Sequence, residues 1–202
     1  SKQLIDTPPV QAAEGLILLG QGSHGEAVRH LQRAGLPLVV WGAPDANSPC
    51  IVVGSDNRKG GASVAARFID MQRKQLLFIG DINHAEVQER CTGFMDALGE
   101  HAHAVTILRP KAFTFEAGFD CIAAHIKKKG RHFDGVFAAS DLLAMGAIRA
   151  LIENNMAIPD DVSVIGYDDT PGAASFAPAL TSVHQYLRDG GTLLAKKVLG
   201  LI

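Results

Sequence analysis

A strand–helix–strand pattern stands out in the stretch GVFAASDLLAMGAIRALIENNMAIPDDVSVIGYDD, which runs from Gly135 to Asp169. Its two ends, Gly135–Ala138 and Val162–Tyr167, are short and almost continuously apolar, as strands buried on both faces of a parallel sheet are. Between them, Asp141 is placed to cap the start of a helix, and Asn154-Asn155 are placed at its end. The apolar residues in between recur at helical spacing: Leu142, Leu143, Gly146, Ala147, Ala150 and Leu151. This order predicts two parallel strands joined by a crossover helix.

The same alternation extends over the rest of the chain. One helix is expected at Glu26–Ala34, and another has a helical face at Ala62, Ala65, Ala66 and Ile69. Further strands are expected at Gly15–Leu19, Leu38–Trp41, Cys50–Val53, Gln75–Ile79 and Val105–Leu108. This alternation of strands and helices predicts an α/β fold with mainly parallel sheets flanked by helices.

Length, composition and charge narrow the class of protein. The chain has 202 residues, of which 47% are hydrophobic and 20% are charged, which allows one large core or two smaller ones. The formal net charge is −2, and the dense basic run Lys127–Lys129 precedes Gly130, which favours a helix end over a nucleic-acid surface. Cys50, Cys91 and Cys121 stand far apart without metal-binding spacing, which is typical of a reduced, cytoplasmic protein.

The two ends of the sequence indicate whether the chain is a fragment and whether it carries a targeting signal. It opens in a polar, proline-containing stretch and stops at Ile202 inside an apolar helical run, so we expect a piece of a longer chain. No signal peptide is visible, and no apolar run approaches the roughly 18 residues that a membrane span requires. We therefore expect no association with a membrane.

One glycine pattern raises the question of dinucleotide binding. The strand at Gly15–Leu19 runs into Gly20-x-Gly22-x-x-Gly25, the spacing with which a turn holds a pyrophosphate. Such a site also needs an acid at the end of the next strand, but here that strand ends in Trp41-Gly42. The glycines are therefore interpreted as a strand-to-helix turn with positive φ angles.

Other short motifs do not assemble a metal site or a catalytic site. The pair His101-x-His103 lacks a third ligand at a suitable spacing and is interpreted as a solvated loop. Lys59 precedes the glycines beside it, which does not fit a phosphate-binding P-loop, and no nucleophile elbow is present. We therefore expect no metal, no cofactor and no enzymatic activity.

Polar side chains gather where strands of the predicted sheet end. Asp81, the pair Ser140-Asp141 and the pair Asp168-Asp169 each follow an expected strand. Ligands of open parallel sheets bind outside the carboxyl ends of the strands, so these residues are candidates for a binding site. Because successive residues of a strand point to opposite sides, one of Asp168 and Asp169 is expected to face the ligand and the other to pair locally.

Taken in order, the motifs of the chain match those of a known family. They are VGSDNRKGGASVAARFI (Val53–Ile69), QLLFIGD (Gln75–Asp81), ERCTGFMDAL (Glu89–Leu98), FTFEAG (Phe113–Gly118) and the segment Asp134–Tyr186. In sequence and spacing they resemble the effector-binding domain of the lac repressor/galactose repressor (LacI/GalR) family of bacterial transcription regulators. The resemblance covers essentially the whole chain.

The resemblance implies a two-lobed, periplasmic-binding-protein-like α/β fold, each lobe a mainly parallel sheet flanked by helices. The first lobe would comprise residues 1–74 with 186–202 and would be incomplete, and the second would comprise residues 75–185. The DNA-binding head of the family, the start of its first lobe and its final strand would be absent from this chain.

The resemblance also implies ligand-binding positions, of which Arg90 and Asp168 have the clearest chemistry. The planar fork of Arg90 suits vicinal sugar hydroxyls or a carboxylate. Ionised Asp168 leaves a strand end and can accept two hydroxyl donors. The alternatives are an exposed ion pair of Arg90 with Glu86 or Glu89, and a local capping role of Asp168 in the turn that follows it.

Three further ligand-binding positions are implied. Phe113 matches an aromatic that stacks on a sugar face, with a core aromatic as the alternative. Ser140 stands where many members have Asn, so it keeps a hydroxyl but loses the reach of the amide. Gln185 follows LTSVH and can both donate and accept, and Asp81 is a further candidate. Trp41-Gly42 stands where many members carry an acid, which removes one polar contact and offers a large ring instead.

By this resemblance the chain is the ligand-sensing, non-catalytic domain of a transcriptional regulator. A small effector, expected to be a sugar or sugar derivative, would bind in the cleft between the lobes and modulate DNA binding. Operator DNA would be bound only through the head domain outside this chain, and the protein would be a cytoplasmic homodimer. The alternatives are a periplasmic sugar-binding protein of a transporter, which shares the fold, and a nucleotide-dependent α/β enzyme.

Overall fold

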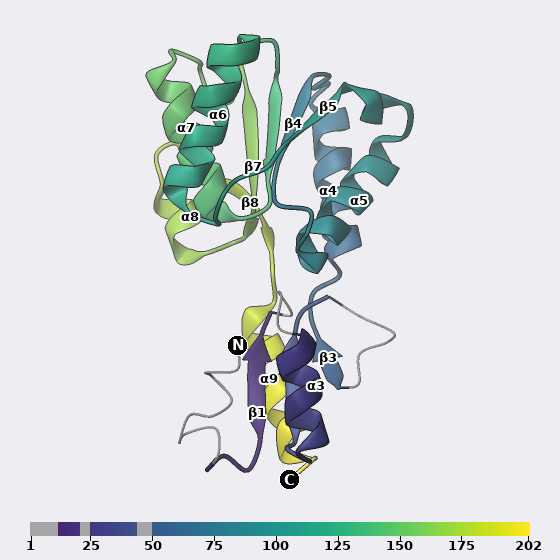
Figure 1. Ribbon diagram of the computed structural model, residues 1–202. Helices are drawn as coiled ribbons and strands as arrows, with labels where there is room; N and C mark the ends of the chain where they lie inside the picture. The colour runs from purple at the N-terminus through teal and green to yellow at the C-terminus, as the bar shows by residue number, and fades with distance from the viewer. Residues whose placement is uncertain (1–11, 21–24, 44–49) are drawn as a thin grey trace. The chain divides into compact units, whose positions relative to one another are not determined.

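A computed structural model describes residues 12–20, 25–43 and 50–202 of the chain, which divide into two compact α/β units (Figure 1). Unit 1 takes its described residues from the chain up to Asp56, from His84–Glu86 and from Tyr186–Ile202. Unit 2 comprises Asn57–Asn83 and Val87–Gln185. The strands of both units pair in parallel, so the α/β class with two parallel sheets flanked by helices is confirmed.

Unit 1 contains a sheet of three strands in the order β1 (Leu16–Leu19), β2 (Leu38–Trp41) and β3 (Ile51–Val53). Helices α3 (Gly25–Arg33) and α9 (Leu187–Leu199) complete its described part. Because side chains alternate along β2, its residues feed two small cores. Leu38 and Val40 pack with Val28 and Leu31 of α3, whereas Val39 packs with Leu194 and Val198 of α9. The two helices therefore pack against opposite faces of the sheet.

Unit 2 contains a sheet of five strands in the order β5-β4-β6-β7-β8. The strands are β4 (Leu76–Ile79), β5 (Val105–Leu108), β6 (Gly135–Ala138), β7 (Ser163–Asp168) and β8 (Thr181–His184). The helices are α4 (Asn57–Asp70), α5 (Ala85–Leu98), the 3-10 helix η1 (Gly99–Ala104), α6 (Phe115–Lys129), α7 (Asp141–Glu153) and α8 (Pro171–Ser175).

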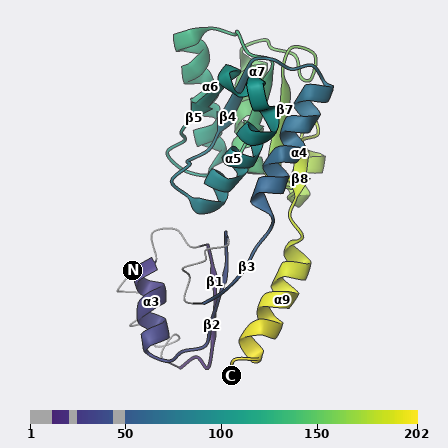
Figure 2. The ribbon, with the colours of Figure 1, turned by 90° about the vertical axis from the view of Figure 1, so that its right-hand side faces the viewer.

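The two faces of this sheet are covered by different helices. Figure 1 shows α6 and α7 on one side of the strands and α4 and α5 on the other, and Figure 2 shows the same unit turned by a quarter. Leu77 and Ile79 of β4 pack into the core with Ile122 of α6, whereas Phe78 packs into the other core with Phe94 of α5. Burial on both faces explains why the central strands are continuously apolar.

Most strand ranges agree with the sequence predictions, but three details differ. The segment Thr181–His184 forms an edge strand that the sequence analysis did not identify. The N-cap of α7 is Ser140, and Asp141 is the first residue of the helix. Helix α4 is present, but its buried face is set by Phe68 rather than by Ile69, which is 44% exposed.

The boundary between the units also differs from the expectation. The predicted first lobe extended to residue 74, whereas α4 already belongs to unit 2. The physical reason is that Val64, Ala65 and Phe68 of α4 pack into the same core as Leu76 and Phe78 of β4.

Several other expectations concern loops, cysteines and membrane association. Gly20 has the positive φ angle expected of a strand-to-helix turn, at 77°, while residues 21–24 of the glycine loop lie outside the described part. The side chain of His103 also lies outside it, and His101 lies in η1. Within the described residues, Cys50, Cys91 and Cys121 form no disulfide. Within residues 12–20, 25–43 and 50–202, no helix has the length and apolarity needed to cross a membrane.

Candidate functional site

Three neighbouring strands of unit 2 bring polar residues to one end of the sheet. Strands β6, β7 and β8 lie side by side and run parallel, so their carboxyl ends meet at the same edge. Ser140 follows β6 by two residues, Asp168 ends β7, and Gln185 directly follows β8. This is the end of an open parallel sheet at which ligands bind.

Arg90 reaches the same place from helix α5. Its side chain is buried at 8% exposure, and its Nε donates to Asn57 Oδ1 at 2.8 Å. Its Nη1 donates to the carbonyl oxygen of Ala139 at 2.7 Å, and its guanidinium carbon lies 3.8 Å from the centre of the Tyr167 ring. The alternative of an exposed ion pair with Glu86 or Glu89 is therefore wrong, because the guanidinium group points into the unit.

The position of Arg90 depends on the close approach of α4 and α5. A Cβ atom at Gly61 of α4 would lie 2.0 Å from the Arg90 carbonyl oxygen, and one at Gly93 of α5 would lie 2.0 Å from the Arg58 carbonyl oxygen. Both distances are shorter than any real contact of a Cβ atom, so only glycine permits the two helix backbones to pack this tightly. This packing brings Asn57, at the start of α4, within hydrogen-bonding distance of Arg90.

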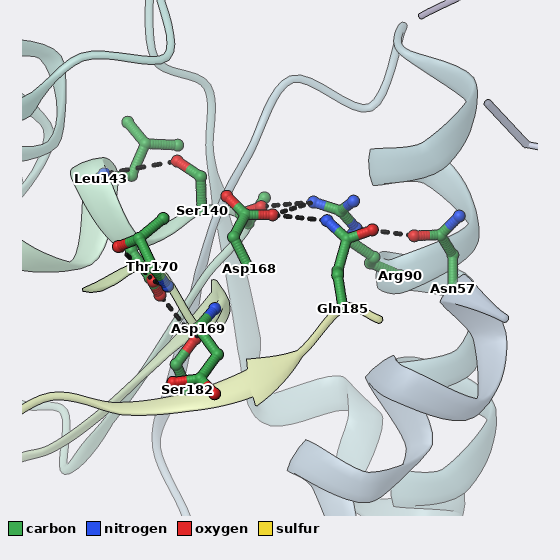
Figure 3. A network of polar contacts seen from close by, with 11 residues as sticks. Asn57, Arg90, Ser140, Leu143, Asp168, Asp169, Thr170, Ser182 and Gln185 are labelled. Atoms are coloured by element: carbon green, nitrogen blue, oxygen red, sulfur yellow. Dashed lines mark hydrogen bonds and ion pairs between the residues drawn. The ribbon is translucent and has the colours of Figure 1, made fainter. Parts of the chain in front are cut away.

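The carboxylate of Asp168 has three partners, one of which is the Asp141 backbone N–H. Gln185 Nε2 donates to its Oδ1 at 2.6 Å, and Arg90 Nη1 lies 3.9 Å from the same oxygen (Figure 3). Gln185 is itself buried, whereas 27% of the Asp168 side chain stays exposed. Burial raises the pKa of Asp168 above its ordinary value, although Arg90 and the Gln185 hydrogen bond oppose the shift. The structure thus brings together Arg90, Asp168 and Gln185, which we call the carboxylate cluster.

The backbone at Asp168 is strained. Its φ angle is 112° and that of Asp169 is 53°, both in the region that residues with side chains rarely adopt. The two carboxylates have separate partners, since Asp169 Oδ2 lies 2.8 Å from His184 Nδ1. Asp169 thus pairs locally, as expected of one of the two acids, whereas the orientation of Asp168 toward a ligand stays a prediction. Strain of this kind is retained where the surroundings enforce it, which is common at binding sites.

Asp141, which was expected to cap a helix and was also a candidate at the end of a strand, holds this turn in place. It is fully buried and accepts hydrogen bonds from the Thr170 backbone N–H at 2.7 Å, from Thr170 Oγ1 at 2.9 Å and from Ser182 Oγ at 2.5 Å. Ser182 Oγ in turn accepts from the Asp169 backbone N–H at 3.0 Å. The proposed capping role of Asp168 is therefore wrong, because Asp141 takes the donors of the following turn.

Ser140 has a structural role that limits its use in binding. It is buried at 9% exposure, and its Oγ accepts from the Leu143 backbone N–H at 3.4 Å, which caps α7. Its neighbour Ala139 supplies the carbonyl oxygen that holds Arg90. Ser140 thus lies next to the carboxylate cluster in sequence, while its hydroxyl oxygen already has a backbone partner.

The remaining candidates lie at other strand ends. Phe113 follows β5, which is separated from β6 by β4, and it packs half-buried against both cores of unit 2. Asp81 follows β4, and its Oδ1 accepts from the Asn83 backbone N–H at 3.1 Å, a local turn. In unit 1, Trp41 packs against the core formed with α9.

Sequence reasoning did not identify three contributors to this site: Asn57, Tyr167 and Ser182. Asn57 lies in the motif Val53–Ile69 that resembles the family, but the sequence does not show that its side chain accepts a hydrogen bond from Arg90, 33 positions away. Tyr167 ends an apolar run and was interpreted as part of a strand. The hydrogen bond from Ser182 Oγ to Asp141 joins residues that are 41 positions apart, so no local sequence pattern reveals it.

The chemistry of the carboxylate cluster is that of recognition. It offers a carboxylate acceptor, a guanidinium donor and an amide that can do both, which suits a ligand rich in hydroxyl or other polar groups. No group of three or more His, Cys, Asp or Glu residues suited to a metal occurs in the part of the chain that the structure describes.

Comparisons with known proteins agree on the family. The sequence profile of the periplasmic binding protein-like domain matches residues 65–202. The HTH-type transcriptional repressor PurR of Haemophilus influenzae is 32% identical over 158 residues, which cover 74% of this chain and 45% of PurR. The chain therefore spans about half the length of the curated relatives of this kind that it matches. These relatives are transcriptional repressors and regulators rather than enzymes.

Solved structures give the same result. A LacI-family transcriptional regulator from Burkholderia phymatum is 31% identical, with a TM-score of 0.84 over 95% of this chain and 70% of that chain. A LacI-family transcriptional regulator from Enterococcus faecium, solved with bound ribose, is 26% identical, with a TM-score of 0.83 over 94% of this chain and 71% of that chain. The chain therefore belongs to the LacI family of transcriptional regulators, as its periplasmic-binding-protein-like effector-binding domain.

Proposed function

We propose that this chain senses a small polyhydroxylated effector, a sugar or sugar derivative, through the carboxylate cluster of Arg90, Asp168 and Gln185. The observation that carries the proposal is the partly exposed Asp168 carboxylate at the carboxyl end of β7, held by a buried Gln185 and facing a buried Arg90. A carboxylate acceptor beside donors that are already held in place is preorganised for ligand hydroxyls, because these side chains lose little conformational entropy on binding.

The chemistry of the three side chains favours hydroxyl groups. An ionised carboxylate can accept about four hydrogen bonds, of which Gln185 Nε2 and the Asp141 backbone N–H supply two. The exposed part of the carboxylate is then suited to accept from a ligand hydroxyl. The ribose bound to the Enterococcus faecium relative supports the same ligand class.

For the full regulator, we propose that effector binding changes the affinity for operator DNA. The coupling is reciprocal, so operator DNA would change effector affinity by the same factor. DNA would be bound by a helix-turn-helix part of the full regulator rather than by these 202 residues, whose formal net charge is −2. A cytoplasmic homodimer is the corresponding assembly. The regulator names of the relatives favour this function over that of a transport protein.

A thermal-shift panel tests the proposal. The compounds are D-ribose, cellobiose, D-gluconate and adenosine, each measured with the unmodified chain, with Asp168→Asn and with Asp169→Asn. We expect at least one sugar or sugar acid to raise the Tm of the unmodified chain and of Asp169→Asn but not of Asp168→Asn.

Two results would count against the proposal in different ways. A shift by adenosine alone that Asp168→Asn abolishes would keep the site and overturn the sugar class. A sugar-induced shift that Asp168→Asn leaves unchanged would overturn the site.

A further inference from the structure

Unit 2 contains a cavity that the carboxylate cluster does not use. It has a volume of about 700 Å³ and is lined by residues of β4, β5, α6 and the turn after α6. Strand β5 is one edge of the sheet, whereas β8, which precedes Gln185, is the opposite edge. The volume falls within the roughly 300–1,000 Å³ that is usual for sites of small molecules.

The charge of the lining is one-sided. Arg109, Lys128 and Lys129 line the cavity, and no Asp or Glu does. This contrasts with the chain as a whole, whose formal net charge is −2. Among residues 12–20, 25–43 and 50–202, none of these three cations forms an ion pair. Their charges therefore add in one place with no carboxylate in the lining, which attracts an anion.

The rest of the lining is apolar or aromatic. Leu77 and Phe133 belong to the core on the α6 side of the sheet, and Leu108 packs against the same core. The ring of His125 lies edge-on to that of Phe133, with the centroids 5.4 Å apart and an angle of 81° between the rings. This contact fixes the imidazole at the wall of the cavity. The surface therefore combines an apolar floor with a cationic rim.

We propose that this cavity binds a small organic phosphate, with its dianionic group at Arg109, Lys128 and Lys129 and its apolar part on Leu77, Leu108 and Phe133. A phosphate monoester carries about −1.5 to −2 charges at neutral pH and has three strong acceptor oxygens. Lys and Arg are the residues that proteins use to bind such groups. A ligand with a single carboxylate carries one negative charge and would neutralise less of the positive charge of this lining than a phosphate monoester does.

His125 gives the site a local reporter. Burial, with a smaller contribution from the charge of Lys129, holds the pKa of His125 below its ordinary value. A dianion bound beside Lys129 would oppose that charge and favour the imidazolium form. The pKa of His125 should therefore rise when the cavity is occupied.

A titration with phenyl phosphate, followed through the histidine resonances by NMR, tests the proposal. Phenol serves as the uncharged match and phenyl sulfate as the match with a single charge. We expect phenyl phosphate to shift the His125 resonances and raise the pKa of that ring, with phenyl sulfate weaker and phenol weaker still. Higher salt should weaken the binding, because the cations are exposed.

The run Lys127–Lys129 supplies a matched control for the same titration. Lys127 lies in the same helical turn and is exposed, but it does not line the cavity. We expect the double variant Lys128→Ala/Lys129→Ala to weaken phenyl phosphate binding about tenfold or more, and Lys127→Ala to weaken it less than about twofold. Asp168→Asn should leave this affinity unchanged, so the outcome is independent of the proposed effector site.

Three kinds of result would overturn the proposal. One is the absence of any phenyl phosphate effect on His125. Another is an equal loss of affinity in Lys127→Ala and in the double variant, which would indicate attraction to the helix surface in general. The third is equal binding of phenol, or loss of the binding in Asp168→Asn, either of which would place the compound elsewhere.

Discussion

The guanidinium carbon of Arg90 lies 3.8 Å from the centre of the Tyr167 ring, with both side chains buried. Tyr167 directly precedes Asp168, so the ring that supports the cation and the acid that faces it come from adjacent positions of β7. A cation stacked on an aromatic face gains about 0.5–2 kcal/mol, and it loses freedom to rotate away. The stack therefore fixes the donor of the carboxylate cluster.

Replacing the ring should separate this contribution from burial alone. We expect Tyr167→Leu to weaken effector binding by roughly threefold to thirtyfold, since about 0.7–2 kcal/mol of cation–π energy is lost. Tyr167→Phe keeps an aromatic face and should lose clearly less. Isothermal titration calorimetry with the best compound of the panel compares the two. Equal losses in both variants would show that the ring face is not what holds Arg90.

Asn57 should act on the site through Arg90. In Asn57→Ala the buried Nε of Arg90 loses its partner, which costs about 1–3 kcal/mol of stability and lowers effector affinity as the guanidinium shifts. Arg58→Ala is the adjacent control, because its ion pair with Asp96 spans 3.6 Å between side chains that are 60% and 68% exposed. That pair contributes about 0–1 kcal/mol at most. Urea denaturation and calorimetry of both variants check the prediction, which fails if Arg58→Ala costs as much as Asn57→Ala.

Ser182 should stabilise the turn that presents Asp168. Ser182→Ala removes one of the three donors to buried Asp141 and the acceptor of the Asp169 N–H, at an expected cost of about 1–3 kcal/mol. Thr181→Ala, at the exposed neighbouring position, should cost less than about 1 kcal/mol. Thermal unfolding of the two variants measures the difference. A stability of Ser182→Ala equal to that of the unmodified chain would remove Asp141 from the account of this turn.

At Asp168, a fall in pH should raise the stability of the fold and lower the affinity for the effector. Its pKa is raised in the folded protein, so the folded state binds the proton more tightly than the unfolded chain does. Ionised Asp168 therefore disfavours the fold above that pKa, and this cost is relieved as the pH falls through it. Effector affinity should fall over the same range, because the protonated acid loses acceptor capacity.

The variant Asp168→Asn isolates both effects. We expect its Tm to exceed that of the unmodified chain at neutral pH and the difference to vanish as the pH falls below the raised pKa. Thermal melts across a pH series measure this. A Tm of Asp168→Asn below that of the unmodified chain at neutral pH would mean that Arg90 and Gln185 outweigh the burial of the carboxylate.

The fold was largely predictable from the sequence because its central strands are buried on both faces. Continuous apolar runs such as Gly135–Ala138 therefore carry a strong signal. The edge strand Thr181–His184 is half-exposed and mixes polar with apolar residues, so it was missed. The position of α4 was misjudged because Phe68 packs against strands that come later in the chain, and spacing within one helix does not show which sheet it covers.

The candidate site was predictable only in part. Family motifs pointed to Arg90, Asp168 and Gln185, and the structure brings these three together. The motifs did not reveal what holds them, because Asn57, Tyr167 and Asp141 act through contacts between distant segments. Ser140 is the opposite case, because its hydroxyl oxygen accepts from the Leu143 N–H three residues later. A local rule of helix capping describes this contact.

The most direct test of the proposed function is a calorimetric titration of the same effector into Asp168→Asn and Asp169→Asn. The two acids are neighbours with positive φ angles, but only Asp168 contacts Gln185 and faces Arg90, whereas Asp169 pairs with His184. We predict that Asp168→Asn lowers the affinity for the panel's best sugar by about tenfold or more, while Asp169→Asn changes it less than about threefold. Unchanged affinity in Asp168→Asn, or an equal loss in both variants, would contradict the assignment of the carboxylate cluster as the effector site.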